Sequence, residues 1–114
     1  MLKERDMARA KMIVLAKAAE GQAKALDDWY ETRHVHDLLA VPGITSIERF
    51  DVQMMKSPDG TTWDYAGIYE IEADDINAVL KEMGARMGGP QMPGSPTLDS
   101  SKTLAIIAHE KPGK

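Results

Sequence analysis

Residues 11–53 read KMIVLAKAAEGQAKALDDWYETRHVHDLLAVPGITSIERFDVQ, which predicts a strand, a helix and a second strand in succession. In residues 11–17, apolar side chains fall on both faces, a pattern typical of a strand buried on both sides. Residues 22–40 are rich in Ala, Lys, Leu, Glu and Gln and predict a helix. That helix must end before Val41, because Pro42 disfavours helical geometry in the preceding residue, and residues 44–53 follow as a strand rich in Ile, Thr, Phe and Val.

The rest of the chain continues the alternation of strands and helices. A Ser-Pro-Asp-Gly turn at 57–60 joins the second strand to a third at 63–72, and the two are expected to form a hairpin. Asp74 or Asp75 caps a second helix, and residues 103–110 close the domain as a fourth strand. The order βαββαβ predicts an α+β fold, in which right-handed crossovers place both helices on one face of a four-stranded antiparallel sheet.

The length of 114 residues predicts a single domain that spans residues 1–114. Residues 1–10 are interpreted as an N-terminal tail that is frayed or contacts a partner. Residues 84–102 hold four Gly, three Pro and three Ser and are too long for an ordinary connector. We expect either a lid, with Met87 and Met92 as adaptable apolar contacts, or a mobile surface loop.

The sheet face opposite the helices is predicted to be apolar and uncovered. The first and last strands carry apolar side chains on both faces. An uncovered apolar face of that size is typical of an interface or a pocket. We therefore expect two copies to pack sheet against sheet about a two-fold axis, as a homodimer with an apolar pocket for a small hydrophobic or aromatic ligand.

The composition of the chain argues against several classes of partner and several kinds of site. There are 14 Lys and Arg against 18 Asp and Glu, the net charge is −4, and the basic residues are scattered, so nucleic acid is not expected. The chain has no Cys, which excludes disulfides, thiolate zinc sites and Cys nucleophiles and suits a cytoplasmic protein. No apolar run approaches the roughly 20 residues that span a bilayer, so no membrane association is expected.

One face of the first predicted helix carries side chains that are able to take part in catalysis. At about 100° per residue, this face holds Trp29, Tyr30, Arg33, His34 and Asp37. In the functional interpretation, His34 is the proton carrier, because an ordinary His pKa of about 6.5 lies nearest to working pH. Asp37 would fix the tautomer of His34, and Tyr30 would hold a substrate oxygen. In the alternative, the polar side chains form a surface network and His34 is a hydrogen-bonded packing residue.

Aromatic side chains of the third strand are further candidates for substrate binding. Trp63, Tyr65 and Tyr69 share one face of this strand at period 2. They either line a pocket for an aromatic or polyketide-like ligand or pack in the core of a dimer. Trp29 is also a candidate for substrate binding, or it forms a cation–π pair with Arg33.

The remaining polar candidates are two arginines and two histidines. Arg49 either pairs near Asp51 or points into the cavity, and Arg33 and Arg49 are candidate partners for a substrate carboxylate. His109 either lines the cavity or is exposed at the end of its strand. On a helix, His36 points about 200° away from its neighbour two positions earlier, so the two cannot share one ion, and no metal is expected.

Residues 28–43, DWYETRHVHDLLAVPG, followed by Ser46, Arg49 and Phe50, resemble the dimeric α/β-barrel superfamily, specifically its EthD-like branch. Members of that branch have a W-Y-x-x-x-H-x-x-D-x-x-x-x-P-G pattern on the first helix. By motif the resemblance covers residues 11–53, and elsewhere it rests on the order of elements. It implies a ferredoxin-like domain that forms homodimers, with the ligand cavity between the sheet and the helices of each subunit.

Relatives in that branch include cofactor-free monooxygenases, polyketide cyclases such as olivetolic acid cyclase, lyases, isomerases and members with no known reaction. In such relatives a cavity His often acts as acid or base. By position, the resemblance implies this role for His34, with Tyr30 and Asp37 beside it. Two features depart from the pattern: His36 stands where relatives often have Pro, and the loop at 84–102 is long.

We therefore expect a cofactor-independent enzyme, a lyase or an isomerase that uses general acid/base catalysis. Its substrate would be a hydrophobic aromatic or cyclic carbonyl compound of a catabolic or polyketide-like kind. One alternative is a cofactor-free monooxygenase of quinone-type substrates. A second alternative, from a different class, is a non-catalytic ligand-binding or accessory protein.

Overall fold

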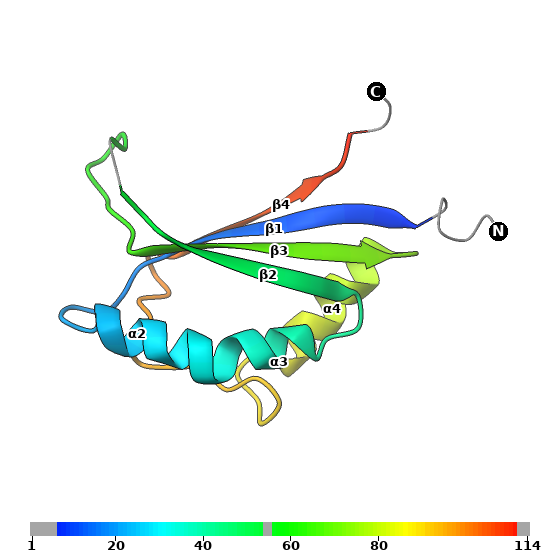
Figure 1. Ribbon diagram of the computed structural model, residues 1–114, viewed down its shortest axis with the longest axis horizontal. Coiled ribbons are helices and arrows are strands. Elements are labelled where there is room, and N and C mark those ends of the chain that lie inside the picture. Colours follow the sequence, from blue (N-terminus) through cyan, green and yellow to red (C-terminus); the bar gives the residue numbers. More distant parts are fainter. Residues whose placement is uncertain (1–6, 54–55, 112–114) are drawn as a thin grey trace.

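The computed structural model describes residues 7–53 and 56–111. A sheet forms one layer and the helices form a second layer on one side of it (Figure 1). In chain order the elements are β1 (Ala8–Ala16), α2 (Ala23–Trp29), the π-helical segment η1 (Tyr30–His34), α3 (Val35–Leu39), β2 (Ile44–Asp51), β3 (Tyr65–Ala73), α4 (Ile76–Arg86) and β4 (Leu104–His109). Because α2, η1 and α3 follow one another without a break, they form the first predicted helix, and the predicted order βαββαβ is confirmed.

The sheet has four strands in the order β2-β3-β1-β4, and every neighbouring pair is antiparallel. β1 pairs with β3 from Ala8 opposite Ala73 to Ala16 opposite Tyr65. The two inner strands are therefore β1 and β3, while β2 and β4 are the edges. The apolar side chains on both faces of β1 fit its position inside the sheet.

Several predicted boundaries differ from the observed ones. β1 begins at Ala8 rather than at residue 11, because residues 8–10 pair with β3, so the predicted tail is too long. Residues 1–6 lie outside the described part of the chain. β3 begins two residues later than predicted, at Tyr65, and α4 extends to Arg86, into the predicted loop. The carboxylate of Asp75 accepts the backbone N–H of Asn77 at 3.0 Å, which confirms the predicted cap of α4.

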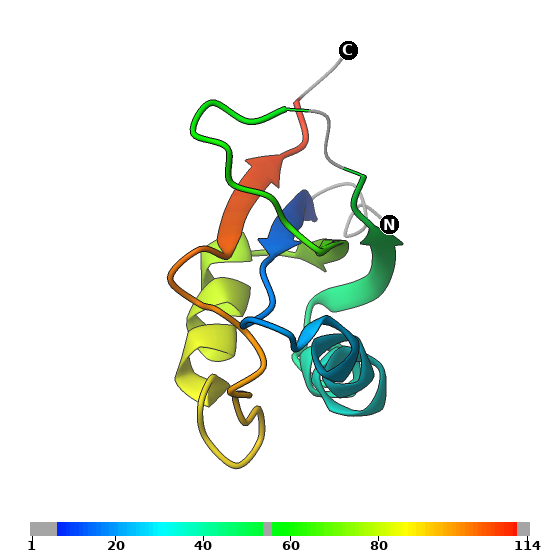
Figure 2. The ribbon, with the colours of Figure 1, turned by 90° about the vertical axis from the view of Figure 1, so that its left-hand side faces the viewer.

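The core lies between the sheet and the helices, which cover one face (Figures 1 and 2). Its most deeply buried side chains are Leu26, Leu38, Val41, Ile71 and Met92. At the turn from α3 into β2, Gly43 has a φ of +103°, and a Cβ there would lie 2.5 Å from a methyl group of Val79. A glycine is therefore required where this turn passes α4.

The other face of the sheet is open and is apolar in part, since ion pairs of Arg9 with Glu72 and of Lys11 with Glu70 occupy one end of it. Three large side chains on its outer strands are substantially exposed: Phe50 on β2, and Leu104 and Ile106 on β4. In the register of the sheet, Ile106 stands opposite Ile13 of β1, which stands opposite Ile68 of β3. This set of side chains, the open face, matches the predicted uncovered apolar surface.

The helix that carries the candidate site contains a wide turn. Its inward side chains Leu26, Tyr30 and Leu38 recur at multiples of four residues, and each step of four advances about 40° beyond a full α-helical turn. Leu38 would therefore lie about 120° from Leu26 on a regular α-helix. The π-helical segment η1 has more residues per turn and brings these side chains back to the sheet.

The segment between α4 and β4 packs against the rest of the chain. Met87 and Met92 form an isolated bridge, and the N–H of Gly88 donates to the carbonyl of Met92 at 2.8 Å. Farther along, the N–H of Ala19 donates to the carbonyl of Thr97 at 2.8 Å. Figure 2 shows this segment running between the two helices.

Candidate functional site

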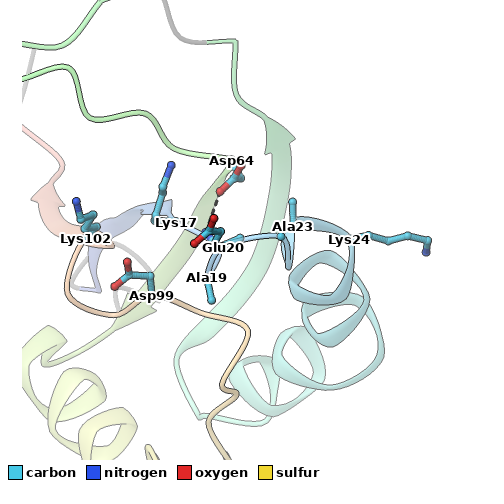
Figure 3. A pocket seen from close by; sticks show the side chains of 10 residues that line it. Lys17, Ala19, Glu20, Ala23, Lys24, Asp64, Asp99 and Lys102 are labelled. Atoms are coloured by element: carbon cyan, nitrogen blue, oxygen red, sulfur yellow. Dashed lines mark hydrogen bonds between the residues drawn. The ribbon is translucent and has the colours of Figure 1, made fainter.

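A wide polar hollow of about 530 Å³ lies where β1 ends and β3 begins (Figure 3). The carboxylate of Asp64 accepts the N–H of Ala18 at 2.8 Å, and that of Asp99 accepts the N–H and hydroxyl of Ser101 at 3.0 and 2.6 Å. Lys24 points away from the hollow in Figure 3. These groups hold their own loops in place and do not converge on one point, so we place the candidate site elsewhere.

A second cavity, of about 210 Å³, lies between the helix-covered face of the sheet and the helices. We call it the His34 cavity. Its walls come from β1, β3, the helix that contains η1, α4, the segment before β4 and β4 itself. The lining residues are Met12, Val14, Trp29, Tyr30, His34, Leu38, Tyr69, Met83, Met87, Met92, Pro93, Gly94, Leu98, Thr103 and Ala105.

His34 is held in this cavity by two aromatic rings. Its imidazole stacks on the indole of Trp29, with centroids 4.3 Å apart and planes 18° apart, and Tyr30 meets it edge-on at 5.2 Å. Its Nδ1 is buried and has no hydrogen-bond partner in residues 7–53 and 56–111. Burial lowers the pKa of His34 to about 4, although the Asp37 carboxylate opposes this shift. The imidazole is therefore neutral at pH 7, and the expected ordinary pKa is corrected.

Two phenols form the polar end of the cavity. Tyr30 and Tyr69 are both almost fully buried, and their hydroxyl groups are hydrogen-bonding partners. Burial raises the pKa of Tyr30, while Tyr69 and the charge of Arg49 lower it. Burial also raises the pKa of Tyr69, and Tyr30 adds to that rise. Both phenols therefore stay protonated at neutral pH and can donate hydrogen bonds.

Arg49 lies beside this pair but is already occupied. Its Nη1 lies 2.7 Å from a carboxylate oxygen of Asp27 and 2.7 Å from one of Glu31. The guanidinium carbon also lies 4.6 Å from the centroid of the Tyr30 ring and 5.2 Å from that of Tyr65. Arg49 therefore joins β2 to the first helix, and neither Asp51 nor the cavity takes its charge.

Arg33 and Asp37 pair with each other at the edge of the cavity. The Nε of Arg33 donates to the Asp37 carboxylate at 2.7 Å, and its Nη2 donates to the carbonyl of Pro90 at 3.1 Å. Asp37 was expected to fix the tautomer of His34, and this expectation is corrected: its charge acts on His34, but its hydrogen bond goes to Arg33. An i,i+4 pair on the same helix competes successfully for this carboxylate.

Four other candidates lie outside the His34 cavity. Trp63 precedes β3 and donates its indole N–H to the carbonyl of Lys102 at 2.8 Å. Tyr65 donates its hydroxyl to the carbonyl of Ala23 at 3.0 Å. His109 is exposed at the edge of the sheet, and the Nε2 of His36 lies 3.1 Å from the carbonyl of Glu31.

Several lining residues were not anticipated as part of the site. Met12 and Val14 lie in the strand predicted at residues 11–17, and Met83 lies in the second predicted helix, but none of them was a candidate for the site. The sequence contained this information, because the strand face with Met12 and Val14 and the helix face with Met83 both point into the layer between the sheet and the helices. Leu38 gave no such signal, since the wide turn at η1 is needed to bring it inward.

In residues 7–53 and 56–111, no group of three or more His, Cys, Asp or Glu side chains is arranged to hold a metal ion. None of the helices in the same ranges has the length and apolar character needed to span a membrane.

No family model matches the chain, and no curated protein matches its sequence. Solved structures match over nearly the whole length. An ethyl tert-butyl ether D (EthD) family protein from Bacillus halodurans is 22% identical, with a TM-score of 0.57 over 90% of this chain and 99% of that one. A dimeric protein of ferredoxin-like fold from Bacteroides fragilis is 16% identical, with a TM-score of 0.57 over 90% of this chain and 96% of that one. The fold is ferredoxin-like.

A third structure with this ferredoxin-like fold is a provisionally assigned monooxygenase from Shewanella loihica. It is 14% identical, with a TM-score of 0.57 over 95% of this chain and 97% of that one. The neighbours therefore include EthD family and dimeric ferredoxin-like proteins, in agreement with the resemblance in residues 28–43. Identities this low establish the fold alone, so the function has to be argued from the chain's own side chains.

Proposed function

We propose that this protein is a cofactor-independent lyase or isomerase that moves a proton next to a carbonyl group, with His34 as acid and base. The substrate is a hydrophobic aromatic or cyclic carbonyl compound. One observation carries the proposal: the buried Nδ1 of His34 has no partner although it belongs to a residue that lines a cavity. Buried polar atoms are normally paired, and unpaired ones often mark a site where a ligand binds.

The arrangement of the cavity supports a defined proton transfer. A nitrogen of the neutral His34 accepts the proton from the carbon beside the carbonyl, and the C–H electron pair moves to the carbonyl oxygen. Tyr30 donates a hydrogen bond to that oxygen as negative charge develops. In an isomerase the imidazolium then returns the proton to another carbon. In a lyase the enolate re-forms the carbonyl and expels a leaving group, which takes the proton from the imidazolium.

The low pKa of His34 is compatible with this role, because negative charge develops on the substrate beside it during the reaction. A neutral imidazole is available as a base throughout the neutral range. When the enolate forms, its negative charge stands beside the new imidazolium, and in a site shielded from water this pairing stabilises both ions. The Asp37 carboxylate acts in the same direction.

Proton exchange tests the proposal without knowledge of the natural product. The protein is incubated with acetophenone or cyclohexanone in D₂O, and loss of the proton beside the carbonyl is followed by NMR. We expect exchange above the buffer rate, and a fall of about 100-fold or more in His34→Gln, typical of removing a general base. Thr32→Ala, on the exposed side of the helix, is the matched control. Unchanged exchange in a folded His34→Gln variant would refute the assignment.

The open face supports the further proposal that the protein is a homodimer. Its exposed Leu104, Ile106 and Phe50 form an apolar surface that a second copy would cover. Solved structures of this fold from three bacteria are described as dimeric. A two-fold axis would place the open faces of two copies against each other.

A cofactor-free monooxygenase of quinone-type substrates is the second candidate function. It is favoured by the neighbour from Shewanella loihica, whose fold matches over 95% of this chain. The two functions differ in their use of oxygen. Oxygen consumption with a reduced quinone such as a naphthohydroquinone, above that of His34→Gln, would favour the monooxygenase, while exchange without oxygen uptake favours the lyase or isomerase.

A further inference from the structure

Among the residues that the structure describes, 7–53 and 56–111, none of those that line the His34 cavity has a permanent charge. Its polar groups are the imidazole of His34, the hydroxyls of Tyr30 and Tyr69, and the hydroxyl of Thr103. The imidazole is neutral at pH 7 because burial lowers its pKa. An anionic ligand would therefore lose its water without gaining a counter-charge, which is strongly unfavourable.

The two nearby cations are not available to such a ligand. Both short contacts of Arg49 are to carboxylates on the first helix, and its side chain is only 13% exposed. Arg33 is paired with Asp37 at 2.7 Å and also holds the carbonyl of Pro90. A substrate carboxylate bound to either guanidinium would stand beside a carboxylate that is already paired with it, and the two negative charges would repel each other.

The volume and walls of the cavity indicate the shape of the ligand. An apolar cavity of about 150 Å³ accommodates benzene, so one of about 210 Å³ leaves room for a ring with a short substituent. Four lining residues are methionines: Met12, Met83, Met87 and Met92. Their flexible thioethers make favourable contacts with aromatic rings. Because the hydroxyl groups of Tyr30 and Tyr69 are hydrogen-bonded to each other, one O–H of the pair is left to donate to a single acceptor oxygen.

We infer that the His34 cavity selects neutral, single-ring aromatic compounds with one carbonyl oxygen and rejects the corresponding carboxylates. This inference deepens the proposed function, since it names the charge and size of the substrate at the same site. It replaces the expectation that Arg33 or Arg49 binds a substrate carboxylate, because both arginines already have carboxylate partners.

Binding of matched probes tests the inference without turnover. Acetophenone and benzoate have the same ring and the same number of non-hydrogen atoms but differ in charge. Each is titrated into ¹⁵N-labelled protein at about pH 7.5, where the His34 imidazole is neutral. The protein has two Trp residues, and the indole N–H signal of Trp29 reports on the cavity, while that of Trp63, bonded to Lys102, is an internal control.

We expect acetophenone to shift the Trp29 signal and leave the Trp63 signal in place, with benzoate at least about 100-fold weaker. A longer probe, 4-acetylbiphenyl, is expected to bind more weakly than acetophenone although it is more apolar. Benzoate within about threefold of acetophenone, or no shift of Trp29 with acetophenone, would overturn the inference on charge. Tighter binding of 4-acetylbiphenyl would overturn the inference on size.

A charge added at the mouth of the cavity provides a second test. Met87 lines the cavity and is 54% exposed, so its replacement is tolerated more easily than that of a core residue. Relative to Met87→Gln, the neutral control for the lost methionine contact, Met87→Lys is expected to raise the ratio of benzoate affinity to acetophenone affinity about tenfold or more. No gain for benzoate in a folded Met87→Lys variant would contradict the charge argument.

The binding experiment and the exchange experiment test different claims, and either claim can be refuted while the other stands. Selective binding of acetophenone without any proton exchange would refute the proposed function and leave the ligand class in place. Exchange of acetophenone together with equally strong binding of benzoate would refute the ligand class and leave the proposed function in place.

Discussion

The imidazole of His34 lies face to face with the indole of Trp29, 4.3 Å away. The two residues are five positions apart, a separation at which side chains on a regular α-helix do not stack. The π-helical segment from Tyr30 to His34 has hydrogen bonds of that longer spacing and brings the rings together. A local irregularity of the helix thus places the imidazole against an apolar surface and keeps water from one of its nitrogens.

Removal of the Trp29 ring is expected to restore the ordinary titration of His34. Burial is the main cause of the low pKa of His34, and Trp29→Ala exposes the imidazole to water. We expect its pKa to rise from about 4 toward 6.5, followed by NMR titration of the imidazole C2–H. Trp63→Ala is the matched control, since its ring lies elsewhere. An unchanged pKa in Trp29→Ala would show that another group shields the imidazole.

The protein is expected to become less stable as the pH falls from 6.5 toward 4, because His34 resists protonation in the folded state. Its pKa is about 4 when folded against 6.5 for the free group, so between these values the unfolded chain binds a proton that the folded chain does not. The free energy of unfolding therefore decreases as the pH falls from 6.5 toward 4. From about pH 7 to about pH 4.5, the wild type should lose about 2 kcal/mol more than His34→Gln in urea unfolding.

Other groups that titrate in this range are common to the wild type and to His34→Gln, so the difference between the two pH dependences isolates His34. Equal losses of stability in the two proteins would mean that His34 titrates normally in the folded state. A larger loss in the variant would have the wrong sign for a buried neutral imidazole.

The strands and their order were predictable from the sequence because they depend on local patterns. Alternation along residues 11–17 identified the two faces of β1, and the turn at 57–60 identified the hairpin. The boundaries were less predictable. The start of β1 at Ala8 depends on pairing with Ala73, which is distant in the sequence.

The site was predictable only in part. His34 and Tyr30 were identified because they are chemically capable residues on one helix face, and both line the cavity. The roles of Arg49 and Asp37 were not predictable, because each depends on which of several opposite charges comes closest after folding. Met92 was predicted as an apolar contact of a lid and lines the cavity, but Pro93 and Leu98 belong to a segment without periodicity, so no pattern indicated their position.

Loss of the Arg49 side chain is expected to destabilise the fold. Arg49 pairs with Asp27 and Glu31 and lies over Tyr30, with only 13% of its side chain exposed. In Arg49→Met the two carboxylates lose their shared partner, and we expect a cost of about 2–4 kcal/mol in the free energy of unfolding. Lys24→Met removes an exposed ion pair with Asp28 and is expected to cost less than about 0.5 kcal/mol. Equal costs in urea unfolding would mean that the Arg49 network contributes no more than a surface pair.

A charge among the apolar side chains of the open face is expected to separate the proposed homodimer. The side chain of Ile106 is 57% exposed and stands opposite Ile13 in the sheet. In the proposed dimer, Ile106→Glu would place a carboxylate against apolar side chains of the second copy without a counter-charge, at a cost of several kcal/mol. We expect the mass in solution to fall from that of two chains to that of one, measured by analytical ultracentrifugation across a range of concentrations.

The matched control for Ile106→Glu is Lys81→Glu, which changes an exposed charge on α4, on the opposite side of the sheet. Lys81→Glu is expected to leave the mass unchanged. Dissociation of Ile106→Glu could then not be explained by the change in net charge alone. Because Ile106 is exposed in the single chain, a charge there should leave the circular dichroism spectrum intact. A wild-type protein with the mass of one chain at the highest concentrations would refute the dimer. A folded Ile106→Glu variant that keeps the mass of two chains would place the interface on another surface.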